Sequence, residues 1–290
     1  MKPIAISVET AADLTPALLK EFDIAVLPFT IVLGSEEKKD GEVHSQDLFD
    51  FVAKTGVLPR TAAVNVGEFD AHFKKLLSEY ESIVHISLSS GISCAYQNAK
   101  VAAEAFDGKV SVIDSRSLST GIATLAVYAA KLREAGYDAK EIVDLVSKRI
   151  PSLQTSFALE NVEYLFKGGR CSALARLGVN LLKIKPEIVL DPALGTMRNT
   201  KKFRGPREKW VLDYVEDTLK EYDNPDLELV FITASSMDQE IVEKVRARLK
   251  ERGFKRIEYT NAGATISTHC GPNCLGILYI NDGPHPIERK

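Results

Sequence analysis

The chain has 290 residues, of which 45% are hydrophobic and 27% charged, the ordinary composition of a globular protein with a well-buried core. Its 37 basic and 40 acidic side chains give a net charge of −3, which argues against nucleic acid or an anionic membrane as a partner. The N-terminus does not resemble a signal peptide, and no apolar stretch approaches about 18 residues. The protein is therefore expected in the cytoplasm, without stable membrane insertion.

In the first half of the chain, apolar segments alternate with amphipathic ones, which predicts an α/β domain with a mostly parallel sheet. Strands are expected over residues 4–8, 24–33, 83–88 and 110–113. Helices are expected over residues 14–21, 45–54, 67–78, 120–134 and 139–149. Pro28 indicates an edge or a bend in the second strand. Pro151 is the expected boundary between an N-terminal domain, 1–151, and a C-terminal domain, 152–290.

The second half continues with strands and helices of similar length. Strands are expected over residues 153–159, 184–190, 196–202, 227–233, 256–260 and 275–280. Helices are expected over residues 162–166, 172–182, 206–221 and 239–252. A polar loop is expected over 261–275, because it combines glycines, a proline and several hydroxyl side chains.

A hydroxyl-rich turn follows the apolar strand 83–88. It contains Ser89, Ser90 and Ser93 and leads into a helix. In an α/β protein, the carboxyl end of such a strand is a common ligand site, and the first N–H groups of the next helix favour an anion. Serine hydroxyls add donors without adding charge, so a carboxylate or a phosphate is the expected ligand. The alternative is that these serines only cap the helix.

Three further polar segments contain candidate ligand residues. Thr61 lies in the loop 59–63, Arg170 follows two glycines, and His269 lies in the loop 267–272. Arg170 can hold a carboxylate through two parallel hydrogen bonds. His269 can donate to an anion, or it can satisfy a backbone carbonyl. Taken singly, each of these residues also has a purely structural interpretation.

The four cysteines show no pattern of a secreted disulfide scaffold, so reduced thiols are expected. His269, Cys270 and Cys274 are close enough in sequence to suggest zinc. No second pair of ligands has the required spacing, so we expect no metal site.

Motifs in a fixed order extend across both halves of the chain. The most specific are Tyr164-Leu165-Phe166-Lys167-Gly168-Gly169-Arg170 and Ile184-Lys185-Pro186. The others are Asp13-Leu14, Val26-Leu27-Pro28-Phe29, Pro59-Arg60-Thr61, Ser89-Ser90-Gly91-Ile92-Ser93, Tyr96-Gln97-Asn98-Ala99, Val112-Ile113-Asp114-Ser115 with Ser119 and Gly121, and His269-Cys270-Gly271-Pro272. Together they resemble the DegV family, in the fatty-acid-binding form that serves as the FakB subunit of bacterial fatty acid kinase.

The resemblance implies a two-domain α/β fold, with an N-terminal Rossmann-like parallel-sheet domain and a C-terminal α/β (α+β) domain that enclose one long-chain fatty acid. Carried over to this chain, the carboxylate would be hydrogen-bonded by Thr61 and Ser93, with Arg170 and His269 close to the head group. The acyl chain would occupy an apolar tunnel. Neutral hydroxyls at a helix N-terminus can stabilise a carboxylate without a fully buried ion pair.

The resemblance also implies a partner, a fatty acid kinase that phosphorylates the presented carboxylate for phospholipid synthesis. The chain itself would be a carrier without catalytic residues or a cofactor, and it lacks a Gly-x-x-x-x-Gly-Lys-Ser/Thr motif for ATP. A short basic run is either a docking surface for the kinase or anionic lipid, or a solvated face of a hairpin and helix end. Its members are Lys201, Lys202, Arg204, Arg207 and Lys209.

Several positions depart from the family pattern. Ala62 replaces a serine beside Thr61 and removes one donor. The other departures are Val8-Glu9 in place of Asp-Ser, Cys94-Ala95 in place of Gly-Thr, and Asn273 in place of a glycine. All four candidate ligands survive, so an anionic head group is still expected, while the identity of the acid and the use of a kinase stay open.

Two other functions fit parts of the sequence. Gly91-Ile92-Ser93-Cys94-Ala95 is close to the Gly-x-Ser-x-Gly motif of hydrolases, and Asp114 or Asp191 with His269 would supply the order Ser, Asp, His. The final glycine is replaced, however, and no oxyanion-hole motif precedes it. The second alternative is a stand-alone lipid sensor, which would share the binding site and lack the kinase partner.

Overall fold

The computed structural model describes residues 2–170 and 184–287. Its first layer is a four-stranded parallel sheet in the order β2-β1-β6-β7. The strands are β1 (Lys2–Glu9), β2 (Ile24–Leu27), β6 (Tyr80–Ser87) and β7 (Val110–Asp114). Strand order reverses direction between β1 and β6, so the carboxyl end of β6, where the serine turn begins, lies at the switch point where α/β proteins bind ligands.

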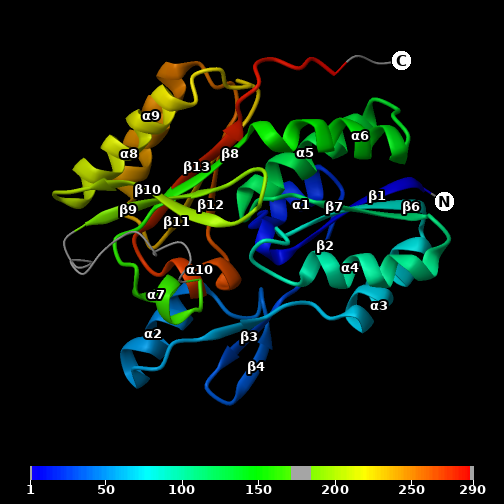
Figure 1. The fold of residues 1–290 in the computed structure, drawn as a ribbon, viewed down its shortest axis with the longest axis horizontal. Coiled ribbons are helices and arrows are strands. Elements are labelled where there is room, and N and C mark those ends of the chain that lie inside the picture. The colour runs from blue at the N-terminus through cyan, green and yellow to red at the C-terminus, as the bar shows by residue number, and fades with distance from the viewer. Residues whose placement is uncertain (1, 171–183, 288–290) are drawn as a thin grey trace.

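Helices cover both faces of the parallel sheet (Figure 1). The five helices of this part are α1 (Pro16–Glu21), α3 (Val66–Leu77), α4 (Ala95–Ala103), α5 (Thr120–Glu134) and α6 (Ala139–Arg149). Helices α3 and α4 pack together on one face, and α5 and α6 pack together on the other. The predicted cap of α1 is present, because the Thr15 hydroxyl accepts a hydrogen bond from the Leu18 amide just before Pro16.

The second layer is a six-stranded sheet in the order β10-β9-β8-β13-β11-β12. Its strands are β8 (Leu153–Ala158), β9 (Lys185–Leu190), β10 (Met197–Phe203), β11 (Val230–Ser235), β12 (Ile257–Asn261) and β13 (Cys274–Ile280). Only β11 and β12 pair in parallel, so this sheet is mixed, whereas the first sheet is parallel as expected. The α/β fold class itself is confirmed.

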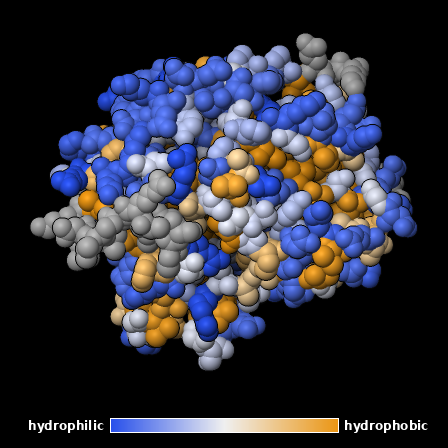
Figure 2. Space-filling view, in the orientation of Figure 1, coloured by the Kyte–Doolittle hydropathy of each residue, from blue (hydrophilic) through white to orange (hydrophobic). Residues whose placement is uncertain are grey.

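Helices α8 (Arg207–Glu221) and α9 (Gln239–Arg252) cover the outer face of this mixed sheet. Their apolar sides form a compact core with the sheet around Trp210, Tyr214 and Tyr279. In Figure 2, mostly hydrophilic side chains cover these two helices. The predicted amphipathic character of both segments is therefore present in the structure.

A third, antiparallel sheet of three short strands extends from the parallel-sheet domain, in the order β4-β3-β5. The strands are β3 (Thr30–Leu33), β4 (Glu36–Lys39) and β5 (Arg60–Ala62), with α2 (Ser45–Thr55) between β4 and β5. The single strand expected over 24–33 is wrong, because Pro28 and Phe29 separate β2 from β3 and the two belong to different sheets. Proline has no amide hydrogen and interrupts a strand ladder.

The prediction of a loop over 261–275 is wrong for part of this segment, because residues Ala264–Cys270 form a helix, α10. The short helix expected over 162–166 is α7 (Glu163–Lys167). The helix expected over 172–182 lies outside the described residues.

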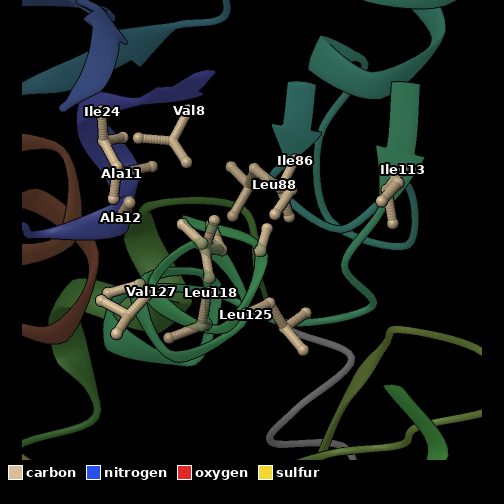
Figure 3. Close-up of a cluster of buried hydrophobic side chains, with 14 of the residues drawn as sticks. Val8, Ala11, Ala12, Ile24, Ile86, Leu88, Ile113, Leu118, Leu125 and Val127 are labelled. Carbon is tan, nitrogen blue, oxygen red and sulfur yellow. The ribbon is translucent and has the colours of Figure 1, made fainter. Parts of the chain in front are cut away.

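Helix α5 lies between the two large sheets and is the centre of the molecule. Eleven of its fifteen residues are buried, among them Leu125 and Val127, since it contacts both the parallel sheet and strands β8, β11 and β13. Figure 3 shows these two side chains beside Val8 and Ile86 of the parallel sheet. The same apolar cluster continues into Phe231 of the mixed sheet. The two layers therefore share one hydrophobic core.

Candidate functional site

A cavity of about 590 Å³ lies where the parallel-sheet domain meets the mixed sheet. This volume is in the range of small-molecule binding sites. Much of the wall is apolar and comes from both halves of the chain: Phe29, Leu88, Ile92, Leu118, Phe157, Leu165, Met197, Ile266 and Leu278. The sequence motifs gave no indication of most of these residues, because they are ordinary core residues whose exposure to a cavity depends on tertiary packing.

The structure brings all four predicted ligand residues to the wall of this one cavity. Thr61 comes from β5, Ser93 from the turn before α4, Arg170 from the segment after α7, and His269 from α10. Among the described residues of the wall, Arg170 and His269 are the only ones with basic side chains, and no carboxylate side chain lines it. The cavity therefore favours a ligand that combines an anionic group with an apolar body.

Thr61 and His269 are in direct contact across the cavity wall. Thr61 Oγ1 lies 2.9 Å from His269 Nε2. Burial, with a smaller contribution from the charge of Arg170, lowers the pKa of His269 to about 3, so the imidazole is neutral near pH 7. His269 Nδ1 is buried and has no hydrogen-bond partner within the described residues. A proton on Nε2 would be donated to Thr61, which leaves the threonine hydroxyl free to donate to a ligand.

A close approach of the backbone fixes the other edge of the imidazole. A Cβ atom at Gly168 would lie 2.7 Å from His269 Nδ1, so a side chain there would displace the ring. This contact explains why the first position of the Gly168-Gly169 motif is a glycine. It places the segment that precedes Arg170 directly against α10.

Carboxylates from the parallel-sheet domain hold the first turn of α10. Asp40 accepts hydrogen bonds from the amides of Ala264 and Thr265 and from the Thr265 hydroxyl. Asp13 accepts one from the Gly263 amide and one from the Ser119 hydroxyl, and burial raises its pKa to about 8. Side-chain oxygen acceptors at a helix N-terminus satisfy amides that have no partner within the helix. Helix α10 is therefore positioned by residues more than 200 places away in the sequence.

The serine turn is held by contacts that differ from one serine to the next. Ser93 Oγ accepts a hydrogen bond from the Ala95 amide at the start of α4. Ser89 instead donates to the carbonyl of Gly195 in the turn between β9 and β10, and Ser90 donates to Asp114. The Ser93 contact is local to the turn and does not cap α4, whose N-cap residue is Cys94, and Ser93 also lines the cavity.

The turn between β9 and β10 approaches the serine turn very closely. A Cβ atom at Gly91 would lie 2.6 Å from the backbone of Leu194 and Gly195. Arg116 adds a hydrogen bond of 2.8 Å to the carbonyl of Ala193. The mixed sheet thus contributes directly to the position of Ser93.

Arg170 is half-buried at the cavity wall. Its guanidinium donates to the carbonyl oxygens of Gly168 and Ile92, at 2.7 and 3.3 Å. Burial lowers its pKa, although a guanidinium stays charged at neutral pH. In the described part of the chain, no carboxylate lies within ion-pair distance of Arg170, so its charge is available to a ligand.

The arrangement does not form a hydrolase triad. His269 Nε2 contacts Thr61 rather than Ser93, and Nδ1 has no acidic partner among the described residues. Asp114 is bonded to Ser90 and Arg116, and Asp191 to the amides of its own turn. A serine nucleophile needs a base that is itself oriented by a third group.

No three potential metal ligands converge within residues 2–170 and 184–287. In the basic run, Lys201, Arg207 and Lys209 form ion pairs with neighbouring carboxylates. These pairs support the interpretation of a solvated face for these three residues.

In the same described ranges, no helix has the length and apolar composition needed to span a membrane.

Comparison with known proteins identifies the family of the chain. The family model described as "Uncharacterised protein, DegV family" matches residues 3–282. A DegV domain-containing protein of Clostridium acetobutylicum is 30% identical over 284 residues, which cover 97% of this chain and 99% of the relative.

Solved structures have the same fold. A DegV family protein from Thermus thermophilus, described for its fatty acid binding, superimposes with a TM-score of 0.89 at 21% identity, over 96% of this chain and 99% of that one. DegV from Bacillus subtilis, described as a fatty acid binding protein, gives a TM-score of 0.83 at 24% identity, over 97% of this chain and 100% of that one. By the match of the family model over nearly its whole length, the chain belongs to the DegV family.

Proposed function

We propose that this protein binds one long-chain fatty acid in the cavity and presents its carboxylate to a fatty acid kinase, which forms an acyl phosphate for phospholipid synthesis. The observation that carries the proposal is the composition of the cavity wall. Apolar side chains from both halves of the chain line the cavity together with hydroxyl side chains, and the Arg170 guanidinium at its wall has no carboxylate partner among the described residues. The fatty acid binding described for the structures from Thermus thermophilus and Bacillus subtilis supports the same class of ligand.

The carboxylate of the fatty acid would be held mainly by hydrogen-bond donors. Thr61 and Ser93 would hydrogen-bond the carboxylate, and Arg170 would supply the opposite charge. Neutral His269 would orient the Thr61 hydroxyl through their 2.9 Å contact. Hydrogen bonds to a charged group stabilise a complex by about 1.5–3 kcal/mol each, so three such donors account for strong selection of an acid.

The apolar wall would provide most of the affinity. Burial of each methylene contributes about 0.8 kcal/mol. A long acyl chain therefore offsets the loss of translational and rotational freedom on binding, which is of the order of 4–15 kcal/mol. A short acid such as acetate would bind only weakly by the same argument.

The polar end of the cavity is open to the surface, which supports presentation to a partner. Ser90, Gly91 and Cys94 all line the cavity and are exposed. A kinase could therefore reach the carboxylate without unfolding of the carrier. A stand-alone sensor would have the same cavity, so the partner decides between these two functions.

The first test is mass spectrometry of an organic extract from natively purified protein, followed by calorimetric titration of the delipidated protein with oleate and with acetate. We expect about one long-chain acid per chain, and binding of oleate only. An extract without lipid, together with no binding of added oleate, would refute the fatty acid function.

The second test adds a bacterial fatty acid kinase and ATP to the loaded protein. Hydroxylamine traps acyl phosphate as a hydroxamate that mass spectrometry detects. Hydroxamate that forms only when both proteins are present would support the kinase partnership. Oleate binding without hydroxamate would favour the stand-alone sensor.

A further inference from the structure

Two buried cysteines lie together in the wall of the cavity. Cys270 is the last residue of α10 and Cys274 the first of β13. Their side chains are only 4% and 6% exposed, both line the cavity, and both are free thiols. Cys270 lies close enough to Cys274 to act on its thiol, and the Cys270 thiol also donates to the carbonyl of Gly271. The carrier function leaves this pair of thiols unexplained.

The backbone between the two cysteines reverses sharply and brings them together. Gly271 and Asn273 both have positive φ, 72° and 56°. The Asn273 amide donates to the carbonyl of Ser235, which anchors the turn on β11. The thiol pair is therefore preformed by the fold rather than created by a chance rotation of two side chains.

We infer that Cys270 and Cys274 are a reversible disulfide site, oxidised by a small organic disulfide such as oxidised glutathione, and that a fatty acid in the cavity blocks this reaction. The second part rests on the proposed function. One cysteine thiolate attacks a sulfur of the oxidant and releases one thiol, which leaves a mixed disulfide on the protein. The other cysteine attacks the mixed disulfide and releases the second thiol. The two cysteine sulfurs are oxidised, the two oxidant sulfurs are reduced, and the two cysteine protons end on the released thiols.

Access to the pair determines when the reaction can occur. The contact with Cys270, together with burial, raises the pKa of Cys274, so little reactive thiolate is present. The cavity brings small molecules to both sulfurs, and an acyl chain that fills it would cover them. The empty protein is therefore the form that reacts.

The site of oxidation adjoins the head-group site. Cys270 directly follows His269, which contacts Thr61. A disulfide bond of about 2.05 Å is much shorter than a contact between two thiols, so its formation draws the end of α10 toward β13. This movement would shift His269 and weaken the hold on the carboxylate. If the disulfide weakens oleate binding, reciprocal coupling requires that bound oleate makes the disulfide less stable by the same factor.

The test uses full-length protein, delipidated and fully reduced, with and without saturating oleate. Oxidised glutathione is added, remaining thiols are alkylated at intervals, and peptide mapping locates each disulfide. We expect a Cys270–Cys274 disulfide in the empty protein, formed at least ten times more slowly with oleate. Glutathione attached only to Cys94 or Cys171, with Cys270 and Cys274 still alkylated, would overturn the inference.

Matched variants separate this pair from the other thiols. Cys94→Ser should still form the Cys270–Cys274 disulfide, whereas Cys274→Ser and Cys274→Ala should not. Oxidised wild-type protein should bind oleate at least fivefold more weakly, with recovery after reduction by dithiothreitol, and oxidant should leave the affinity of the double variant Cys270→Ser, Cys274→Ser unchanged.

The two parts of the inference fail in distinguishable ways. Equal oxidation rates with and without oleate, in protein shown to bind oleate, would refute the protection. If reduced protein binds no oleate at all, the proposed function fails, while formation of the disulfide in the empty protein still tests the site itself.

Discussion

The polar end of the cavity has two walls that are built differently. On one side, Thr61 and Ser93 lie on a three-residue strand and a short turn, and both are partly exposed. On the other side, His269 lies on α10, whose first turn is bonded to buried carboxylates of the other domain, Asp13 and Asp40. The first wall belongs to the surface of one domain, and the second exists only where the two domains meet.

This difference separates binding from stability. A change at Thr61 or Ser93 removes a hydrogen-bond donor to the ligand and breaks few contacts within the protein. A change at the base of α10 leaves buried amides without partners and also displaces His269. Substitutions on the two walls should therefore give different ratios of lost affinity to lost stability.

The largest effect is expected for Asp40→Asn. Asp40 accepts three hydrogen bonds from α10. The asparagine side chain has only one acceptor oxygen, and its NH₂ group would face N–H and O–H groups that also donate. We expect a loss of about 2–4 kcal/mol in the free energy of unfolding, together with weaker oleate binding. Urea denaturation and calorimetry measure the two quantities. Asp50→Asn, on the exposed face of α2, is the control and should change neither by more than about 0.5 kcal/mol.

Arg170→Ala should affect binding more than stability. The guanidinium is bonded to two carbonyl oxygens and faces the cavity without a carboxylate partner in the described structure. Loss of a charge-assisted bond of about 1.5–3 kcal/mol corresponds to roughly 10- to 150-fold weaker oleate binding by calorimetry. Arg60→Ala, in β5 and outside the cavity wall, provides the control. Equal affinities of Arg170→Ala and the wild type would remove Arg170 from the site.

Thr61→Val should give a smaller and purely local loss. Valine keeps the shape and the strand preference of threonine but removes the donor and the contact with His269. We expect about 1–2 kcal/mol of lost binding free energy, or roughly 5- to 30-fold in Kd, with little change in stability. The exposed neighbour allows a control, because Ala62→Ser restores a hydroxyl that does not line the cavity and should leave Kd unchanged.

The smallest effect is a pH dependence from His269. Its pKa is about 3 in the folded protein and near 6.5 when unfolded, so the unfolded state binds more protons between these values. Stability contributed by this residue is therefore present above pH 6.5 and is lost as the pH falls toward 3, at about 1.4 kcal/mol per pH unit.

The comparison of His269→Gln with the wild type at pH 7 and pH 5.5 isolates this contribution. The variant should lose less unfolding free energy over that interval. His72, whose pKa is about 4, acts in the same direction, and Asp13, raised to about 8, acts in the opposite one, but both are common to the two proteins. Parallel pH profiles would show that His269 is not buried as a neutral imidazole.

The sequence patterns predict most elements that depend on local periodicity. The long helices α5, α8 and α9 and most strands of both sheets lie close to their expected positions. Helix α10 was not predictable in this way, because its sequence Ala-Thr-Ile-Ser-Thr-His-Cys is rich in residues of low helix propensity. Its first turn depends on Asp40, which is 224 residues away from Ala264.

The candidate site also combines features that the sequence indicates with features that depend on tertiary contacts. A resemblance to a family identifies Thr61 and His269 as residues of one site, although 208 positions separate them. No local pattern states that their side chains touch, nor that Gly168 must lack a side chain for the imidazole to fit. In the sequence, the spacing of Cys270 and Cys274 suggests only a zinc motif. The turn through Gly271 and Asn273 that brings the two sulfurs together depends on tertiary contacts with β11.

The placement of α5 between the two sheets has a consequence for how the whole chain unfolds. A helix with eleven buried residues that belongs to the core of both layers cannot be exposed from one without loss of the other. The molecule is therefore expected to melt as one cooperative unit, although its architecture has two parts. A lipid bound at their junction would then raise the melting temperature of the entire chain, so thermal denaturation of the intact protein becomes a direct screen for acids of different length.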